Sequence, residues 1–309
     1  MFDKLFYQDK GLFLQSFHPA AVLAYLFVLL LLSLLYDNPI YLLSLLLLLV
    51  LLIKGVDGME AWEGFFKAGV FLMLVVMIVN PLVIRAGATI IWHGPVLPFL
   101  GRLDISMEAV YFGAVSGLRL LVIMSIFCLY NLMVNPDNML NLFSGAAGKS
   151  VLLVALATRM FPTMVRDLKR IKEVLQFRGV DFDEGGLWER VKKYSGLYNV
   201  MLLSSLEDSM EIAESMQARA YGSGRRSVYS RNLLRPRDYL SIGGSLLALS
   251  AATWGLLNGC GRYSFYPVAD VLISDSSTPA ALVVVLFYLS VPLILSEGWK
   301  YCRFIKSKI

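Results

Sequence analysis

The stretch that decides the fold is Ala20–Tyr36 (AAVLAYLFVLLLLSLLY), which is followed closely by Ile40–Ile53 (IYLLSLLLLLVLLI). Both runs are apolar along their whole length, so helices formed by them are hydrophobic on every face and suit a lipid surrounding. The intervening Asp37-Asn38-Pro39 is typical of a tight turn. The two runs are therefore predicted to form a hairpin of membrane helices. The first run is too long, and too directly followed by the second, for a cleaved signal peptide.

Four more apolar runs extend this pattern along the chain. They are Ala68–Ile84, Ala109–Val134, Tyr239–Leu257 and Ala280–Leu295. Hydrophobic residues form 57% of the 309-residue chain and charged residues 17%, whereas a soluble domain has about 45–50% and about 25%. This composition excludes soluble, disordered and collagen-like proteins. The sequence predicts an all-α polytopic membrane protein with about six transmembrane helices, of which the third and sixth should be kinked by Pro81 and Pro292.

The basic residues sort to one side of the predicted membrane. If the N-terminus is cytoplasmic, 24 of the 28 Lys and Arg residues lie on the cytoplasmic side, and such an excess marks cytoplasmic loops. Both termini and the large charged segment are therefore predicted to be cytoplasmic. The loop Ala86–Met107 then faces outward and is expected to form an ordered cap, with Ser106 as the N-cap of the next helix.

Charged residues concentrate in one segment, residues 135–238, which carries 28 of the 51. The chain is accordingly predicted to have three parts. Residues 1–134 form an N-terminal four-helix transmembrane region, residues 135–238 a cytosolic segment, and residues 239–309 a C-terminal two-helix transmembrane region with a tail. The net charge of +5 then reflects membrane topology rather than a basic surface for nucleic acid.

Two long amphipathic helices are predicted in the cytosolic segment. Apolar residues recur at helical spacing in Pro162–Phe177 and again from Leu197 to Ala220. Before them, Val151–Ala157 is apolar but too short to span a membrane, and it is expected to be buried against other helices. Gly179 is a natural end for the first amphipathic helix.

Each amphipathic helix ends in a single arginine flanked by small or apolar residues, in Phe177-Arg178-Gly179 and in Ala218-Arg219-Ala220. Each arginine can simply stabilise the C-terminus of its own helix, an effect of a few tenths of a kcal/mol (about 0.3 or more). The occurrence of the pair, on two helices taken to be parallel, favours a second interpretation. In it, both arginines insert into acidic pockets of a soluble partner, because a guanidinium stays charged and binds carboxylates through two hydrogen bonds.

Most of the chain resembles the transmembrane T component of energy-coupling factor (ECF) transporters, the family that includes the cobalt-transport membrane subunit. Two pieces carry the resemblance specifically, Phe177-Arg178-Gly179-Val180-Asp181 and the run EIAESMQARAY from Glu211 to Tyr221. Four pieces are weaker, and the last of them is expected to open the first amphipathic helix. They are His18-Pro19, Asn80-Pro81-Leu82, Leu118-Arg119-Leu120 and Phe161-Pro162.

This resemblance implies a non-catalytic subunit of an ATP-driven importer of a vitamin or transition-metal ion. In the family, two coupling helices that end in X-Arg-X motifs hold two cytosolic ABC ATPases, and the membrane region holds a small substrate-capture (S) subunit. ATP binding and hydrolysis move the helices, and the capture subunit topples in the membrane and releases its substrate. By resemblance, Arg178 and Arg219 are the ATPase-docking residues, together with their four neighbours in the two motifs. No cofactor is implied.

The two motifs depart from the family pattern, which usually has alanine before the first arginine and glycine after the second. Phe177 makes the first tip bulkier. Ala220 stands where the glycine is usual, so the end of the second helix is expected at Gly222.

Three residues of the fourth apolar run are candidates for structural roles. Arg119 lies inside the span, where a charge is a functional candidate by default, although structural support within the bundle is favoured and no partner is visible in the sequence. Gly113 and Gly117 form a small-xxx-small pattern that allows close helix approach, more in keeping with internal packing than with dimerisation. Gly243-Gly244 is similar, and either surface could receive the capture subunit.

Two other functions remain open, an autonomous secondary transporter and, less well supported, an intramembrane enzyme. Secondary transporters tend to contain internal repeats, and none is apparent between the N-terminal and C-terminal apolar runs. With only two histidines and no acid–base dyad within a span, the chain lacks material for a metal site or a catalytic centre. The sequence GAAGKS at Gly145–Ser150 imitates a phosphate-binding loop, but Phe143 stands where the first glycine is required.

Overall fold

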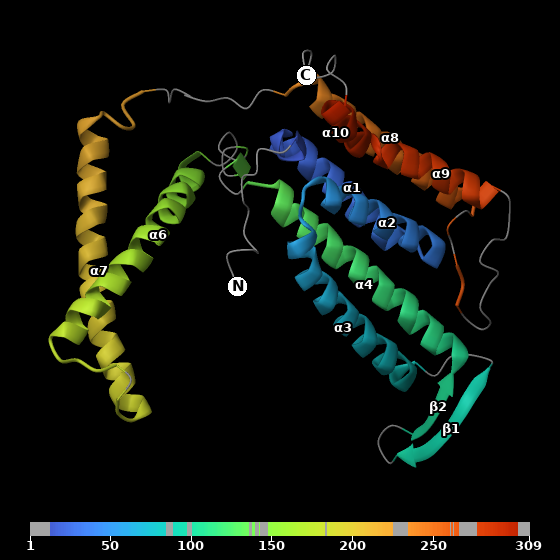
Figure 1. Ribbon diagram of the computed structural model, residues 1–309, viewed down its shortest axis with the longest axis horizontal. Helices are drawn as coiled ribbons and strands as arrows, with labels where there is room; N and C mark the ends of the chain where they lie inside the picture. The colour runs from blue at the N-terminus through green and yellow to red at the C-terminus, as the bar shows by residue number, and fades with distance from the viewer. Residues whose placement is uncertain are drawn as a thin grey trace. The chain divides into compact units, whose positions relative to one another are not determined.

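The protein is represented by a computed structural model that describes residues 13–84, 89–97, 101–135, 138–139, 142, 148–182, 184–224, 234–259, 261, 263–265 and 277–301. The chain divides into two compact units. The membrane unit comprises Met1–Met139 and Asn232–Ile309, and the helical-hairpin unit comprises Leu140–Arg231. Within the described residues both units are helical, apart from one two-stranded ribbon (Figure 1).

The membrane unit contains the apolar helices predicted from the sequence. Its elements are the 3-10 helix η2 (Phe13–Ser16), α1 (Pro19–Leu35), α2 (Pro39–Gly55), α3 (Met59–Val83), β1 (Ile90–Leu97), β2 (Gly101–Ser106), α4 (Met107–Met133), α8 (Pro236–Leu257), α9 (Ser277–Leu289) and α10 (Val291–Tyr301).

Side chains and prolines define where α1, α2 and α4 begin. His18, Asn38 and Ser106 each accept a hydrogen bond from a backbone N–H in the first turn, at 3.2, 3.0 and 3.3 Å. Pro19 and Pro39 occupy the first helical positions, where the missing N–H has no helical partner to lose. The predicted N-cap role of Ser106 is confirmed.

Among the described residues, three helices have the length and hydropathy of a membrane span, namely α3, α4 and α8. α9 and α10 together resemble a fourth span, bent by 47° at a break just before Pro292. α1 and α2 are apolar helices of 17 residues each, at the lower limit for crossing a bilayer. The helical polytopic membrane fold is therefore confirmed, and the six predicted spans correspond to three clear spans, one broken pair and two short apolar helices.

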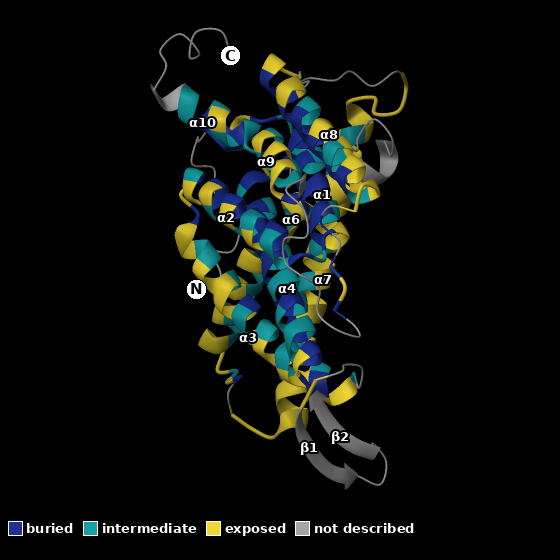
Figure 2. Cartoon of the chain, turned by 90° about the vertical axis from the view of Figure 1, so that its right-hand side faces the viewer, coloured by how far each residue is buried: buried dark blue, intermediate teal, exposed yellow. Residues whose placement is uncertain are grey.

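The buried core of the membrane unit lies among α1, α2, α4, α8 and α9. Figure 2 shows buried residues concentrated along α1 and α4 and few on α3. The hydroxyl of Tyr25 in α1 donates to the Leu289 carbonyl at 2.8 Å, and the hydroxyl of Tyr41 in α2 donates to the Thr278 carbonyl at 2.8 Å. These bonds connect the N-terminal hairpin to α9, although the two segments are more than 200 residues apart in the sequence.

The segment predicted to be an ordered outer cap forms the antiparallel ribbon β1–β2. Ile90 pairs with Ser106 and Leu97 with Gly101, with irregular register between them. This pairing satisfies backbone groups between α3 and α4. The fold is thus helical except for this ribbon, which the apolar runs did not predict.

α3 packs directly on the backbone of α4 through glycines. A Cβ atom at Gly117 would lie 2.6 Å from Met73 Cγ and 2.9 Å from Met73 Cα, and one at Gly113 would lie 3.2 Å from Met77 Cα. Gly244 of α8 similarly faces a backbone carbonyl of α9 at 3.1 Å. Gly113, Gly117 and Gly244 are therefore covered by helices of the same chain, whereas a Cβ at Gly243 would meet nothing within 4 Å.

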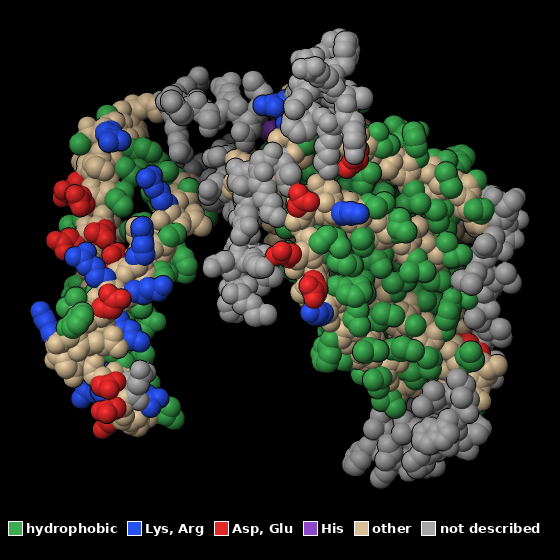
Figure 3. Space-filling view, viewed as in Figure 1, with side chains coloured by type: hydrophobic (Ala, Val, Ile, Leu, Met, Phe, Trp, Pro, Cys, Tyr) green, Lys and Arg blue, Asp and Glu red, His purple; other side chains and the backbone are tan. Residues whose placement is uncertain are grey.

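The face of the membrane unit seen in Figure 3 is mostly apolar. In α3 only Gly69 and Pro81 are buried, while Phe71, Ile78 and Val83 are about two-thirds exposed, at 66%, 65% and 68%. Such a surface suits lipid or a membrane-embedded partner rather than water.

The helical-hairpin unit contains α6 (Gly148–Phe177) and α7 (Leu187–Ala218), and both helices begin earlier than predicted. Pro162 lies inside α6 rather than at its start, a position tolerated here because the helix surface around it is exposed and water can solvate the freed carbonyl. Residues 152–157, expected to be buried, belong to α6 and are mostly exposed. Gly196 interrupts the apolar pattern, so the periodicity predicts a helix start at Leu197, whereas α7 begins at Leu187.

The close approach of α3 and α4 predicts different effects for two Gly→Ala substitutions. Gly117→Ala should destabilise the protein by about 1–3 kcal/mol, because a Cβ would push the backbone of α3 away. Gly243→Ala is the matched control, since nothing lies within 4 Å of the added Cβ, and it should be neutral or stabilising by up to about 1 kcal/mol. Thermal unfolding of the full chain in detergent tests this. Equal transition temperatures for the two variants would contradict the packing described.

Candidate functional site

The two arginine motifs lie at opposite ends of the helical-hairpin unit. α6 and α7 contact each other and cross while running in roughly opposite directions (Figure 1). Phe177-Arg178-Gly179 ends α6 just before the turn into α7, whereas Ala218-Arg219-Ala220 ends α7 itself. Since α7 has 32 residues, it is about 48 Å long. Because α6 and α7 run in roughly opposite directions, they are not parallel, contrary to the expectation from the sequence. The two arginines lie toward opposite ends of α7.

The first motif forms a complete backbone cap at the end of α6. The Gly179 N–H donates to the Gln176 carbonyl at 2.9 Å, and the Val180 N–H donates to the Leu175 carbonyl at 3.0 Å. Gly179 has φ +86°, the left-handed conformation that glycine adopts without a steric penalty. This is a Schellman motif, and Arg178 occupies its C-cap position.

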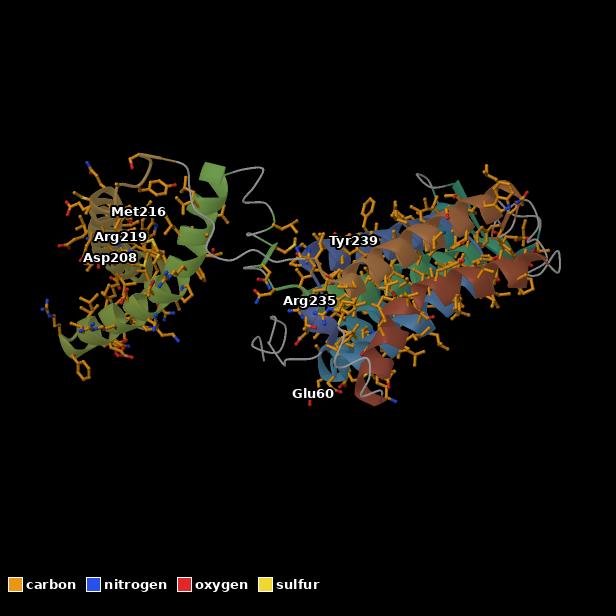
Figure 4. The ribbon with its side chains drawn as sticks, turned by 90° about the horizontal axis from the view of Figure 1, so that it is seen from above. Glu60, Asp208, Met216, Arg219, Arg235 and Tyr239 are labelled. Atoms are coloured by element: carbon orange, nitrogen blue, oxygen red, sulfur yellow. The ribbon has the colours of Figure 1, made fainter. Side chains whose placement is uncertain are left out.

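The second motif repeats this geometry with a different residue. The Ala220 N–H donates to the Gln217 carbonyl at 2.9 Å, and the Tyr221 N–H donates to the Met216 carbonyl at 3.0 Å. Arg219 is the C-cap, and Figure 4 shows it at the end of α7 close to Met216.

Ala220, rather than Gly222, terminates the second helix, so the expected stop at Gly222 is wrong. Ala220 has φ +55°, a conformation that costs an L-residue roughly 1–2 kcal/mol. The two backbone hydrogen bonds of the cap hold the alanine in this conformation. Gly222 also has a positive φ, +94°, but it lies beyond the cap in the following turn.

Both arginine side chains are exposed, and backbone N–H groups rather than guanidinium groups make the caps. Within the described residues, neither Arg178 nor Arg219 has a hydrogen-bond or ion-pair partner. The side chains next to them differ, because Phe177 is 92% exposed whereas the second motif has only alanines. Two similar backbone caps thus present two exposed guanidinium groups, one of them beside a large exposed ring.

A small core stabilises the loop beside the first tip. Phe182 is 1% exposed, its ring centroid lies 5.2 Å from that of Tyr194, and Lys172 Nζ lies 5.6 Å from the ring centroid. Lys193 donates to two carbonyls of the same loop. The sequence interpretation missed this cluster, for which the signal is a single phenylalanine within a polar loop.

The remaining surface of α7 combines apolar and acidic side chains. Leu203, Leu206 and Met210 are 68%, 62% and 65% exposed. The exposed carboxylates are Glu207, Asp208, Glu211 and Glu214, and Figure 4 labels Asp208 among them. No group of three or more His, Cys, Asp or Glu residues in the described ranges could hold a metal ion. Each of the two exposed guanidinium groups can bind a carboxylate bidentately.

Arg119 has a partner that the sequence did not reveal. Its Nη2 lies 2.7 Å from Asp37 Oδ1 and donates to the Tyr36 carbonyl at 3.1 Å. Asp37 belongs to the turn between α1 and α2, so the ion pair joins that turn to α4. This contact supports the turn within the membrane unit.

Known proteins resemble the chain over most of its length. A family model for cobalt transport proteins, CbiQ, matches residues 12–229. The energy-coupling factor transporter transmembrane protein EcfT of Streptococcus thermophilus is 30% identical over 190 residues, which cover 58% of this chain and 71% of the relative. The protein of the same name from Lacticaseibacillus paracasei is 28% identical over 199 residues, covering 60% and 73%. The one from Macrococcus caseolyticus is 22% identical over 243 residues, covering 74% and 89%.

Removal of the backbone strain at Ala220, which has a positive φ, should stabilise the C-terminal cap of α7. Ala220→Gly is expected to strengthen its cap by about 1 kcal/mol, which slows exchange of the Tyr221 amide hydrogen about fivefold. Gly179→Ala is the mirror-image control, because its added Cβ meets nothing within 4 Å and only backbone strain changes. It should accelerate exchange of the Val180 amide. Unchanged exchange in both variants would contradict the cap geometry.

The buried ring under the first tip should matter far more for stability than the exposed ring beside it. Phe182→Ala is expected to cost about 3–5 kcal/mol locally, which should make the loop between α6 and α7 sensitive to proteolysis. Phe177→Ala should change stability by less than about 0.5 kcal/mol. Limited proteolysis of the full chain compares the two, and similar cleavage rates would argue against the small core.

Proposed function

Because the chain belongs to the CbiQ cobalt transport protein family, we propose that it is the transmembrane coupling (T) subunit of an ECF-type importer. It links two cytosolic ABC ATPases to a small membrane subunit that captures a vitamin or a transition-metal ion. The chain is itself non-catalytic, and its partners hydrolyse ATP. The relatives named as ECF transporter transmembrane proteins support this assignment.

The single observation that carries the proposal is the pair of exposed arginines at matching C-caps, neither of which has a polar partner among the described residues. Arg178 and Arg219 present their guanidinium groups at the two ends of one helical hairpin. An arginine that only stabilised its own helix end would be redundant here, because backbone N–H groups already satisfy the last carbonyls. Two arginine side chains at separate helix ends suit two separate ATPase subunits, each offering a carboxylate-lined groove.

The neighbours of each arginine shape the contact. Phe177, at 92% exposure, would insert into an apolar recess beside the acidic groove of one ATPase. Gly179 allows the tight turn behind Arg178. At the second tip Ala218 and Ala220 leave Arg219 unobstructed, so its contact would be smaller and would depend more on charge.

Crossing helices can convert ATPase movement into movement of this unit. Movement of the two docked ATPases during ATP binding and hydrolysis would change the distance between the docking grooves. Since α6 and α7 contact each other where they cross, a change at the tips would alter their crossing angle. The exposed apolar residues of α7 would remain available for a membrane-embedded partner.

The proposed orientation places both termini and residues 135–238 in the cytoplasm, with residues 1–134 and 239–309 forming the membrane regions. Glu60 of α3 and Arg235 before α8 lie at the same end of the membrane unit (Figure 4). The exposed ion pair Lys67–Glu63, at 2.6 Å, lies in the first half of α3. A charged end of this kind suits the cytoplasmic face of a prokaryotic plasma membrane.

Removal of both arginine side chains should release the ATPases. In the variant Arg178→Ala/Arg219→Ala, each lost charged contact should weaken binding by about 2–5 kcal/mol, so the ATPases should no longer co-purify and uptake should stop. Either single replacement should be tolerated better, because the other arginine remains.

The matched control is Arg166→Ala/Arg170→Ala, which removes two exposed arginines from the body of α6 and leaves the tips intact. Co-purification from membranes that express the complete transporter is the measurement. Retention of the ATPases by the double tip variant, or their equal loss from the control, would refute docking through the two tips.

A further inference from the structure

Within the membrane unit, the short helix η2 contacts the two helices that precede and follow the helical-hairpin unit in the sequence, α4 and α8. The chain leaves the membrane unit after α4 and returns at the start of α8. Gln15 Nε2 donates to the Leu132 carbonyl at 3.0 Å, in the last turn of α4. Arg237, in the first turn of α8, donates to the Ser16 carbonyl. One segment therefore bonds to the last turn of α4, before the helical-hairpin unit in the sequence, and to the first turn of α8, after it.

Two buried charged residues at the start of α8 make this contact specific. Asp238 is 1% exposed. Its Oδ1 accepts from the His18 N–H at 3.0 Å, and its Oδ2 accepts from the Arg235 N–H at 2.8 Å. The carboxylate thus caps its own helix and holds the start of α1 at the same time. The sequence interpretation missed this residue because hydropathy placed the span start at Tyr239, although proline followed two residues later by aspartate is a helix-start pattern.

Arg237 adds a second set of contacts from the same turn. We call the contacts of Arg237 and Asp238 with residues 13–18 the clasp. Arg237 is 4% exposed, and its guanidinium carbon lies 5.1 and 5.4 Å from the ring centroids of Phe13 and Phe17. The two rings meet edge to face at a centroid distance of 5.4 Å. A guanidinium against aromatic rings, bonded to a backbone carbonyl, has one well-defined position.

The clasp continues directly into the core of the membrane unit. His18 is the N-cap of α1, and Pro19 is its first residue. α1 packs against α4 and α8, and its Tyr25 hydroxyl bonds to the end of α9. A displacement of the first turn of α8 would therefore be passed to α1 through rigid, directional contacts.

We propose that Arg237 and Asp238, clasped on Phe13–His18, are positioning residues that transmit movement of the helical-hairpin unit to α1. Apolar residues of similar volume would stabilise this junction as well as buried charges do, or better. Charged hydrogen bonds instead fix one geometry, and a fixed geometry is what transmission requires. The proposal rests on the proposed function, since that function supplies the movement.

The test compares ATP-dependent hydrogen exchange at two places in the complete transporter, purified with its ATPases in lipid nanodiscs. Residues 200–224 report on the helical-hairpin unit, and residues 13–22 report on the clasp and the start of α1. In the wild type, ATP should change exchange in both. In Arg237→Gln, residues 200–224 should still respond, while the response of residues 13–22 should fall by a factor of roughly 2 to 30.

Arg235→Gln is the matched control. Arg235 lies two residues before Arg237, and its side chain is exposed. The substitution removes the same charge as Arg237→Gln and keeps the backbone N–H that bonds to Asp238. Its response should equal that of the wild type. Gln15→Leu is a second variant, which leaves Arg237 and Asp238 in place and removes the bond to the Leu132 carbonyl; it should also weaken the response of residues 13–22.

Each outcome decides the proposal. A wild-type response of residues 13–22 in Arg237→Gln would overturn it. If Arg237→Gln does not assemble, an unchanged response in Gln15→Leu would assign the clasp a structural role only, which also overturns it. A wild-type complex without ATPases, or one whose residues 200–224 ignore ATP, would instead refute the proposed function.

Discussion

The structure depends on one constraint, which is that lipid offers no hydrogen bonds to a peptide backbone. The membrane unit meets it with helices whose apolar sides face outward, and the polar side chains described here contact helix ends and turns. His18, Asn38 and Ser106 cap helices there, and the ion pair between Arg119 and Asp37 supports a turn. The buried pair Arg237 and Asp238 follows the same logic, since both residues belong to the first turn of a helix.

The helical-hairpin unit is organised differently, because few of its side chains are buried. Phe182 and Leu197 are its fully buried apolar residues in the described ranges, and much of α6 and α7 is exposed. A helix pair with so little core is poorly stabilised alone. Its exposed leucines and methionines are consistent with a unit that completes its packing with partner subunits, as the proposed function requires.

Hydropathy alone predicted the membrane helices, because a span is specified by a long local run of residues. The two arginine motifs were likewise visible, since a helix end is encoded within a few positions. Contacts between distant segments were not predictable: neither the bond between Arg119 and Asp37 nor the clasp of Asp238 on His18 leaves a local pattern. Local rules also failed where the surroundings overrode them, as at Pro162 inside α6 and at Ala220 in the left-handed conformation.

The antiparallel crossing of α6 and α7 has a mechanical consequence. If either helix rotated about its contact with the other, its end would move much further than the residues at the contact. Each arginine lies at such an end. For a helix about 48 Å long, a rotation of about 10° around its midpoint moves the tip by about 4 Å. Adjustments of packing at the crossing that are smaller than a side chain would thus correspond to displacements of about one residue spacing at the helix tips, where the proposed function places the ATPases.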